Sequence, residues 1–271
     1  LSLHDALPIW TATRPGPCLM TSSDFITLGY DLDAWNQYGI KRPVNIDISP
    51  RSNSHILLSG MSGAGKSFHE HQLLYRLILA ERDKGGEYYF ADYKGDDTFS
   101  YLKGCPRSFT YMDTLTALDL VHARLLARQS GADPARNPVT LVWDEYMAQM
   151  LNLLAQDKKA AAAAMNKVGE VLMLGRSLGI RLAISCQRPD ALAFPAGSRL
   201  NYGIVCVIGA AVRSIYEMLL PDHMEQTKGR QFGRGEGVVL LQGSTLRYIK
   251  VPVIQNESRM RQVCYEALNK G

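Results

Sequence analysis

Eight consecutive residues in the first third of the chain have the types and spacing that phosphate binding requires. They fit the pattern GxxxxGK[ST] and are Gly60, Met61, Ser62, Gly63, Ala64, Gly65, Lys66 and Ser67. The glycines let backbone N–H groups curve around a phosphate, and a following helix adds the positive end of its dipole. Lys66 is expected to reach the β- and γ-phosphate oxygens, and the Ser67 hydroxyl to bind Mg²⁺. The pattern predicts a site for a nucleoside triphosphate, because a plain glycine-rich turn would leave the Lys-Ser pair unexplained.

Two acidic residues follow the apolar run Val-Thr-Leu-Val-Trp at residues 139–143. Asp144, at the carboxyl end of such a strand, can hold Mg²⁺ through water beside Ser67. Glu145 can polarise the water that attacks the γ-phosphate. A buried strand that merely ends in two exposed acids is the plainer alternative. Beside a phosphate loop, the pair indicates hydrolysis rather than binding alone.

A glutamine comes at the end of another apolar run. Gln187 follows residues 180–186, so we expect it to sense the γ-phosphate and to relay its loss to the next loop. Residues 166–169 resemble the guanine-reading pattern NKxD, but residue 169 is a glycine and supplies no carboxylate to read the base. The expected nucleotide is therefore ATP.

Strands and helices must alternate along the chain to bring these residues together. We expect strands at residues 56–58, 87–91, 109–111, 139–145, 180–186 and 203–208, and helices at 68–80, 115–130, 158–173 and 257–269. Residues 237–242 and 245–251 predict a hairpin with a two-residue turn, and residues 10–54 an edge strand or hairpin. The pattern predicts an α/β fold with a mostly parallel sheet, helices on both of its faces and a C-terminal β-hairpin.

Composition limits the class of protein more than its partners. With 271 residues, of which 46% are hydrophobic and 21% charged, the chain can bury the core of one large α/β domain. A formal charge of +4 is compatible with nucleic acid but does not by itself indicate it. The five cysteines include no CxxC pair, which favours reduced thiols and a cytoplasmic domain. No apolar stretch approaches the roughly 20 residues of a membrane span.

Several segments resemble the FtsK/SpoIIIE branch of the FtsK–HerA ATPases, hexameric motors that pump double-stranded DNA. They are residues 55–60 leading into the phosphate loop, 92–95, 143–145, 175–189, 198–203, 213–216 and 232–237, in that order. The segment Gly175–Pro189, with its Gly-Ile turn and terminal Gln-Arg-Pro, is the most specific of them. The resemblance covers residues 26–253 and implies a RecA-like P-loop NTPase fold. Residues 55–271 are thus expected to form the ATPase motor domain, 10–54 its lead-in, and 1–9 a leader foreign to the gene.

The resemblance also implies roles for basic residues. In such rings a neighbouring subunit donates an arginine to the transition state, and position favours Arg124 first and Arg176 second. A solvated helix face is an equal alternative for either one. Pore loops of the family grip the phosphate backbone of DNA, and Lys228, Arg230 and Arg234 are expected to do so here, unless they form only a flexible basic loop.

One departure from the family pattern indicates which of the family's functions this chain is expected to have. Residues 92–95 read Asp-Tyr-Lys-Gly instead of Asp-Pro-Lys, which resembles coupling ATPases of conjugative elements or type VII secretion ATPases. The implied function is a ring, a hexamer, that hydrolyses ATP to translocate double-stranded DNA in conjugative or mobile-element transfer. The alternatives are a type VII-like secretion ATPase that moves a protein and a nucleotide-binding assembly module without turnover. The parent protein could be anchored at the inner face of the membrane through regions missing here.

Overall fold

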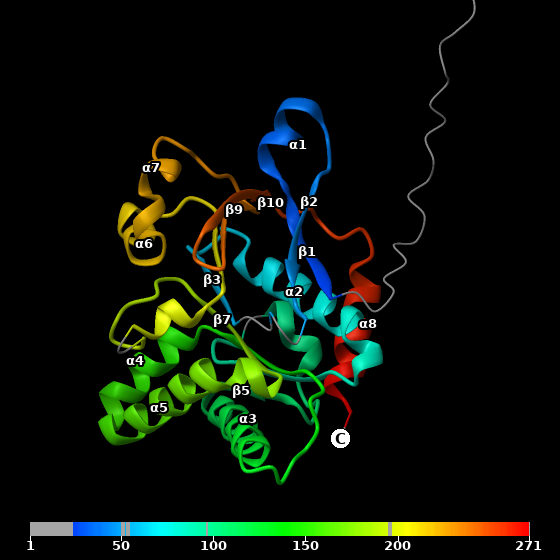
Figure 1. Cartoon of the computed structure of the whole chain (residues 1–271), viewed down its shortest axis with the longest axis vertical. Helices are drawn as coiled ribbons and strands as arrows, with labels where there is room; N and C mark the ends of the chain where they lie inside the picture. The colour runs from blue at the N-terminus through cyan, green and yellow to red at the C-terminus, as the bar shows by residue number, and fades with distance from the viewer. Residues whose placement is uncertain (1–23, 50–51, 53–54, 96, 195–196, 271) are drawn as a thin grey trace, which may run out of the picture.

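One ten-stranded sheet organises the part of the chain that the computed structural model describes, residues 24–49, 52, 55–95, 97–194 and 197–270 (Figure 1). Its strands are β1 (Phe25–Asp31), β2 (Pro43–Asp47), β3 (Ile56–Gly60), β4 (Glu87–Asp92), β5 (Ser108–Thr110), β6 (Val139–Asp144), β7 (Ile180–Cys186), β8 (Ile204–Ile208), β9 (Glu236–Leu241) and β10 (Thr245–Lys250). The order across the sheet is β2-β1-β10-β9-β8-β3-β7-β6-β4-β5. Neighbours are parallel from β8 to β5 and antiparallel from β2 to β8. The mostly parallel sheet and the C-terminal hairpin are confirmed.

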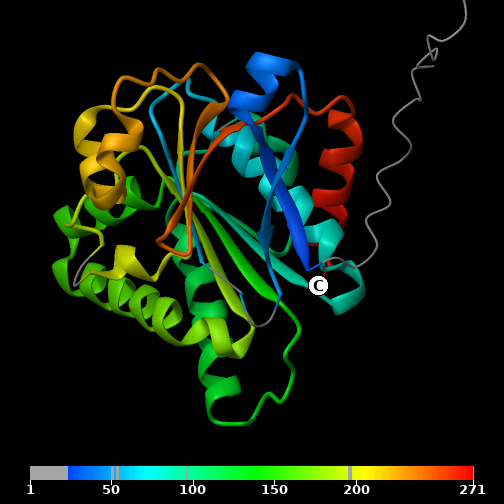
Figure 2. The ribbon, with the colours of Figure 1, turned by 45° about the horizontal axis from the view of Figure 1, so that its top comes forward.

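Helices cover both faces of this sheet (Figure 2). They are α1 (Leu32–Tyr38), α2 (Lys66–Ala80), α3 (Thr114–Gln129), α4 (Tyr146–Gln156), α5 (Lys158–Leu174), α6 (Arg213–Leu219), α7 (Met224–Thr227) and α8 (Glu257–Leu268). The strands alternate between two apolar cores: Ile56 and Leu58 pack with α2 and α8, while Leu57 packs with α3, α4, α5 and α6. The phosphate loop joins β3 to α2 at one end of these layers. Within the described residues, no helix has both the length and the apolar character that crossing a bilayer requires.

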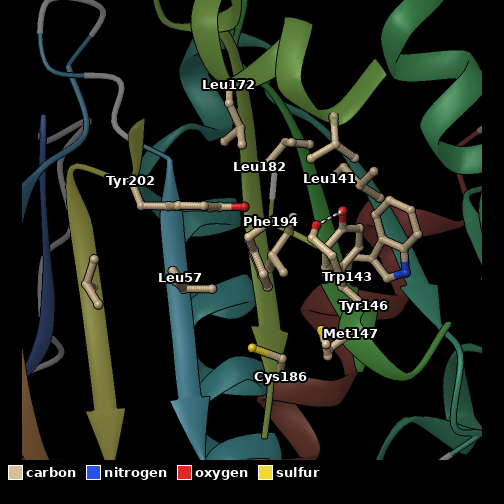
Figure 3. Packing of buried hydrophobic residues seen from close by; sticks show 14 of the residues in the cluster. Leu57, Leu141, Trp143, Tyr146, Met147, Leu172, Leu182, Cys186, Phe194 and Tyr202 are labelled. Atoms are coloured by element: carbon tan, nitrogen blue, oxygen red, sulfur yellow. Dashed lines mark hydrogen bonds between the residues drawn. The ribbon is translucent and has the colours of Figure 1, made fainter. Parts of the chain in front are cut away.

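Aromatic side chains pack around the junction between β6 and α4 in the buried apolar cluster (Figure 3). The rings of Trp143 and Tyr146 meet edge to face with centroids 5.0 Å apart, and Tyr146 meets Phe194 in the same way at 5.3 Å. The Tyr146 hydroxyl donates to the carbonyl of Ala193 at 2.8 Å, and the Trp143 indole N–H donates to Gln149 at 2.9 Å. Trp143 and Tyr146 flank Asp144 and Glu145, so this packing fixes the position of the acidic pair.

An ion pair is buried near the amino ends of the central strands. Arg181 of β7 and Glu81, which follows α2, are 1% and 0% exposed, and the distance from Nη2 to Oε1 is 2.9 Å. The other nitrogen of the Arg181 fork donates to the hydroxyl of Thr140 on β6, while the hydroxyl of Tyr88 on β4 donates to Glu81. These contacts tie three strands to the end of the helix that follows the phosphate loop.

The lead-in forms the expected edge strands, whereas the turn of the C-terminal hairpin differs from the predicted one. Residues 25–47 do form an antiparallel edge pair, β1 with β2, separated by α1. The turn of the β9–β10 hairpin has three residues, 242 to 244, because Leu241 pairs with Thr245, so the two-residue prediction was wrong. Gln242 and Gly243 have φ values of 50° and 69°, and the N–H of Ser244 donates to the carbonyl of Leu241. Ser244 is therefore a third turn residue that pairs with no residue of the opposite strand. Residues 1–23, including the expected leader, lie outside the described residues.

Candidate nucleotide site

The predicted phosphate loop has the backbone conformation that its glycines allow. It leaves β3 at the carboxyl end of the parallel strands and enters α2 at Lys66. Gly63 and Gly65 have φ values of 80° and 96°, in the region where a side chain would be strained. A Cβ on Gly60 would lie 2.9 Å from the carbonyl oxygen of Ile208 on β8. The loop is therefore held against the neighbouring strand with its N–H groups at a helix amino terminus, which suits a phosphate.

Lys66 lies at the centre of the acidic residues that the sequence predicted around it. Its Nζ is 2.6 Å from Asp144 Oδ1 and 3.1 Å from Glu145 Oε1. Burial alone lowers the pKa of Lys66, but the carboxylates of Glu70, Asp144 and Glu145 outweigh it and raise the pKa above its ordinary value. The lysine thus carries its charge next to the place where phosphate oxygens would lie.

Glu145 occupies a strained position between β6 and α4. Its backbone is left-handed, with φ 54° and ψ 38°, a conformation that costs a non-glycine residue about 1 kcal/mol or more and is concentrated at functional sites. Its side chain is 7% exposed and accepts a hydrogen bond of 3.4 Å from the amide nitrogen of Gln187, which follows β7. The structure therefore links the expected catalytic base directly to the expected sensor.

Sequence reasoning missed two buried polar side chains in the same cluster. The Ser185 hydroxyl on β7 lies 2.6 Å from Asp144 Oδ1, 3.1 Å from Glu70 Oε2 and 3.1 Å from Lys66 Nζ. Burial first, and the charge of Asp144 next, raise the pKa of Glu70 well above its usual range. Spacing was the available signal, because Glu70 is four residues after Lys66 on a helix and Ser185 is two residues before Gln187 on a strand.

A cavity of about 420 Å³ opens over the phosphate loop. Besides the loop, Glu145 and Gln187, it is lined by residues from three other segments: Lys94, Thr98, Arg234, Glu257 and Arg261. Ser67 lines this cavity, and the buried Asp144 carboxylate lies 2.6 Å from the Nζ of Lys66, which also lines it. Mg²⁺ is commonly held by one or two such oxygen ligands together with substrate phosphates. The donor chemistry therefore fits the predicted nucleotide and metal.

The three basic residues expected on DNA do not form one group. Arg230 makes a bidentate pair with Asp33, at 2.8 and 3.0 Å, and lies over the ring of Tyr248. Lys228 is exposed and 3.5 Å from Glu225. Arg234 instead lines the nucleotide cavity, in a turn where the N–H of the next residue, Gly235, donates to the carbonyl of Ala64 in the phosphate loop at 2.9 Å. This backbone contact fixes Arg234 beside the phosphate loop, and a role for it on DNA stays a prediction.

Both arginines expected to act on a neighbour lie away from this chain's own phosphate loop. Arg124 of α3 is 3.3 Å from Glu87, the first residue of β4, and 3.3 Å from Asp133. Arg176 is exposed just before β7, at the rim of a second cavity that Arg199 and Leu200 also line. Both positions are at the amino ends of the strands, opposite the phosphate loop. Neither residue can serve the site of its own subunit, and a role across a subunit boundary stays a prediction.

Replacing Arg234 by Ala is expected to weaken ATP binding roughly 10- to 150-fold, because a charge-assisted contact to phosphate is worth roughly 1.5–3 kcal/mol. The dissociation constant for ATP, measured by titration calorimetry, checks this. Lys228→Ala is the matched control, since Lys228 is exposed and paired only with Glu225 among the described residues. Unchanged ATP affinity together with weaker DNA binding in the Arg234 variant would instead favour the role of Arg234 in a pore loop.

The amino-acid sequence was compared with protein-family models and with curated proteins. No protein-family model matches the chain. A curated relative is the FtsK domain-containing protein YdcQ of Bacillus subtilis (strain 168), 25% identical over 197 residues, which are 67% of this chain and 40% of that protein. The chain therefore spans less than half of that relative's length.

Solved structures with the same fold come from two transport systems. The pCW3 conjugation coupling protein TcpA, in a monomer form with ATPγS, has a TM-score of 0.65 and 18% identity, with 90% of this chain and 70% of that chain covered. The cytoplasmic domain of the Thermomonospora curvata type VII secretion ATPase EccC has a TM-score of 0.65 and 20% identity, with 96% and 32% covered. At these identities the structures show the fold alone. With the sequence match to YdcQ, they confirm the resemblance to FtsK-type ATPases.

Proposed function

We propose that this homologue of an FtsK-domain protein is a motor domain that hydrolyses ATP and uses the energy to move double-stranded DNA. The observation that carries the hydrolysis is the contact of Lys66 with both Asp144 and Glu145 at the end of the phosphate loop. A module that only binds nucleotide needs the loop and the lysine but not a buried glutamate linked to Gln187. The third possibility, assembly without turnover, is therefore disfavoured.

The cluster suggests how the chain's own residues act. When ATP arrives, Lys66 would leave the two carboxylates for the β- and γ-phosphate oxygens, and this would free Glu145 to accept a proton from water. The water oxygen attacks the γ-phosphorus, while the bond from that phosphorus to the β–γ bridging oxygen breaks and ADP leaves. Mg²⁺, held by Ser67 and Asp144, would neutralise part of the charge on the phosphates. Gln187, bonded to Glu145, is placed to respond to the loss of the γ-phosphate.

DNA is the cargo that we favour, and conjugative or mobile-element transfer is the proposed setting. The support is the fold shared with a conjugation coupling protein, the sequence relation to YdcQ and the Asp-Tyr-Lys-Gly segment at residues 92–95. A protein cargo is the second candidate, because the fold is shared equally with a type VII secretion ATPase. Hydrolysis by a ring of copies, a hexamer, would let a neighbour's Arg124 or Arg176 reach the γ-phosphate.

The proposed motor domain spans residues 55–271, with residues 10–54 as a lead-in. The pairing of β1 with β10 supports treating the lead-in as part of the same folded unit. We propose a cytoplasmic place for this domain, within a parent protein that could be held at the inner face of the membrane by other regions.

Long double-stranded DNA is expected to raise the steady-state rate of ATP hydrolysis by residues 10–271 at high protein concentration. Stimulation follows if the duplex orders the ring and brings the neighbour's arginine to the site. The Lys66→Ala variant should lose both basal and stimulated activity. Hydrolysis that is indifferent to DNA in a sample shown to form rings would exclude DNA as the cargo and favour a protein. An active Lys66→Ala variant would contradict the assigned site.

A further inference from the structure

Part of the wall of the nucleotide cavity is supplied by α8, almost 200 residues after the phosphate loop. Glu257 and Arg261 line it, and they lie one helical turn apart on the same face of α8. Arg261 donates to Glu257 Oε1 through Nε at 2.9 Å and through Nη2 at 2.6 Å. Its guanidinium lies 5.3 Å from the centre of the Tyr101 ring. The pair is thus oriented before any ligand enters.

Packing holds α8 firmly against the helix that begins at the phosphate loop. Val263 and Cys264 of α8 belong to the same buried apolar cluster as Leu73 and Leu77 of α2. The Asn256 side chain caps α8 by accepting from the N–H of Arg259 at 2.9 Å. The positions of Glu257 and Arg261 relative to Lys66 therefore come from the core, not from a loose C-terminal segment.

The chemistry of the pair suits the nucleoside better than the phosphates. A carboxylate that faces a triphosphate is repelled by it, whereas the same carboxylate accepts hydrogen bonds from ribose hydroxyls. Both Arg261 nitrogens donate to Oε1, and no described residue donates to Glu257 Oε2, so this oxygen can accept from a ligand. A guanidinium whose charge is balanced by a carboxylate still offers a flat face on which a base can stack.

We propose that α8 binds the nucleoside half of ATP, with Glu257 on the ribose hydroxyls and Arg261 against the base. The phosphate loop, Lys66 and Arg234 then hold the triphosphate half. The inference rests on the proposed function, because it needs a nucleotide in this cavity. It gives the C-terminal helix a direct part in the choice of ligand.

Inorganic tripolyphosphate separates the two halves of the cavity, because it carries the phosphates of ATP and no nucleoside. We expect Glu257→Gln and Arg261→Met to weaken ATP binding about tenfold each, the scale of a lost charge-assisted contact. Tripolyphosphate binding should stay within about twofold of the unchanged chain. Calorimetric titration of each Mg²⁺-containing ligand gives both constants. Retained tripolyphosphate affinity also shows that the variants are folded.

Arg259→Met is the matched control, since Arg259 is on the same helix, is exposed and donates its side chain only to Gln262 among the described residues. Equal losses of ATP and tripolyphosphate affinity would mean that α8 contacts the phosphates and would overturn the proposal. Unchanged ATP affinity in both variants would overturn it as well. Failure of the unchanged chain to bind ATP would instead refute the proposed function, so the two failures are distinguishable.

Discussion

Replacing Glu145 by Gln is expected to lower kcat for ATP hydrolysis by roughly 10²- to 10⁴-fold, the usual contribution of a positioned general base. ATP binding should be retained or become tighter. Lys66 Nζ lies 3.1 Å from Glu145 Oε1, and ATP must compete with that carboxylate for the ammonium. A neutral amide of the same shape competes less. Single-turnover hydrolysis together with the dissociation constant for ATP measures the two effects separately.

Glu225→Gln is the control for this prediction, because Glu225 is exposed and its ion-pair partner among the described residues is the exposed Lys228. Hydrolysis by the Glu145 variant at the rate of the unchanged chain would remove Glu145 from the mechanism. It would also favour the alternative of a nucleotide-binding module that does not turn over. A parallel loss of binding and rate would mean instead that the substitution disturbs the left-handed backbone at this position.

Replacing Arg181 by Met is expected to destabilise the fold by about 3–5 kcal/mol, the cost of breaking a buried ion pair from one side. The variant leaves the carboxylate of Glu81 at 0% exposure without its cation. The Tyr88 hydroxyl remains as a hydrogen-bond donor to it, but a neutral donor does not balance a charge. Denaturant unfolding followed by circular dichroism gives the change in the free energy of unfolding.

The double variant Arg181→Met with Glu81→Met should recover most of this loss, because a buried pair replaced by apolar residues of similar volume is often neutral in stability. Arg213→Met tests an exposed ion pair, that with Glu217, and should cost less than about 1 kcal/mol. A double variant as unstable as the sum of its single variants would show that the pair acts through packing and not through charge.

The sequence alone predicted those parts of the site whose residues lie close together along the chain. A phosphate loop needs only local spacing, so Gly60, Lys66 and Ser67 could be identified without a fold. Asp144 and Glu145 follow an apolar run, and parallel strands place their carboxyl ends at one edge, which predicted that they would meet the loop. The strands and helices that the sequence pattern predicted agree with the observed ones to within a few residues.

Residues brought to the site by chain topology were not readable in this way. The basic, glycine-rich segment around Arg234 predicts a DNA contact, but only the fold shows that the turn before β9 rests on Ala64 and brings Arg234 to the cavity. Ser185 and Glu70 lie within the polar cluster, but without the packing of β7 against β6 and α2 nothing distinguishes them from other polar residues. Glu257 joins the cavity only because α8 returns to pack on α2.

The sequence by itself determined which chemical groups are present and which short segments carry them, because glycine conformation, helix polarity and strand alternation act over a few residues. Only the tertiary structure decided which distant groups share the cavity. Contacts such as that of Lys66 with Asp144 span 78 residues and depend on strand order, which arises from the packing of the whole core. The left-handed backbone of Glu145 is likewise a product of the core beneath it, where Trp143 and Tyr146 are fixed on either side.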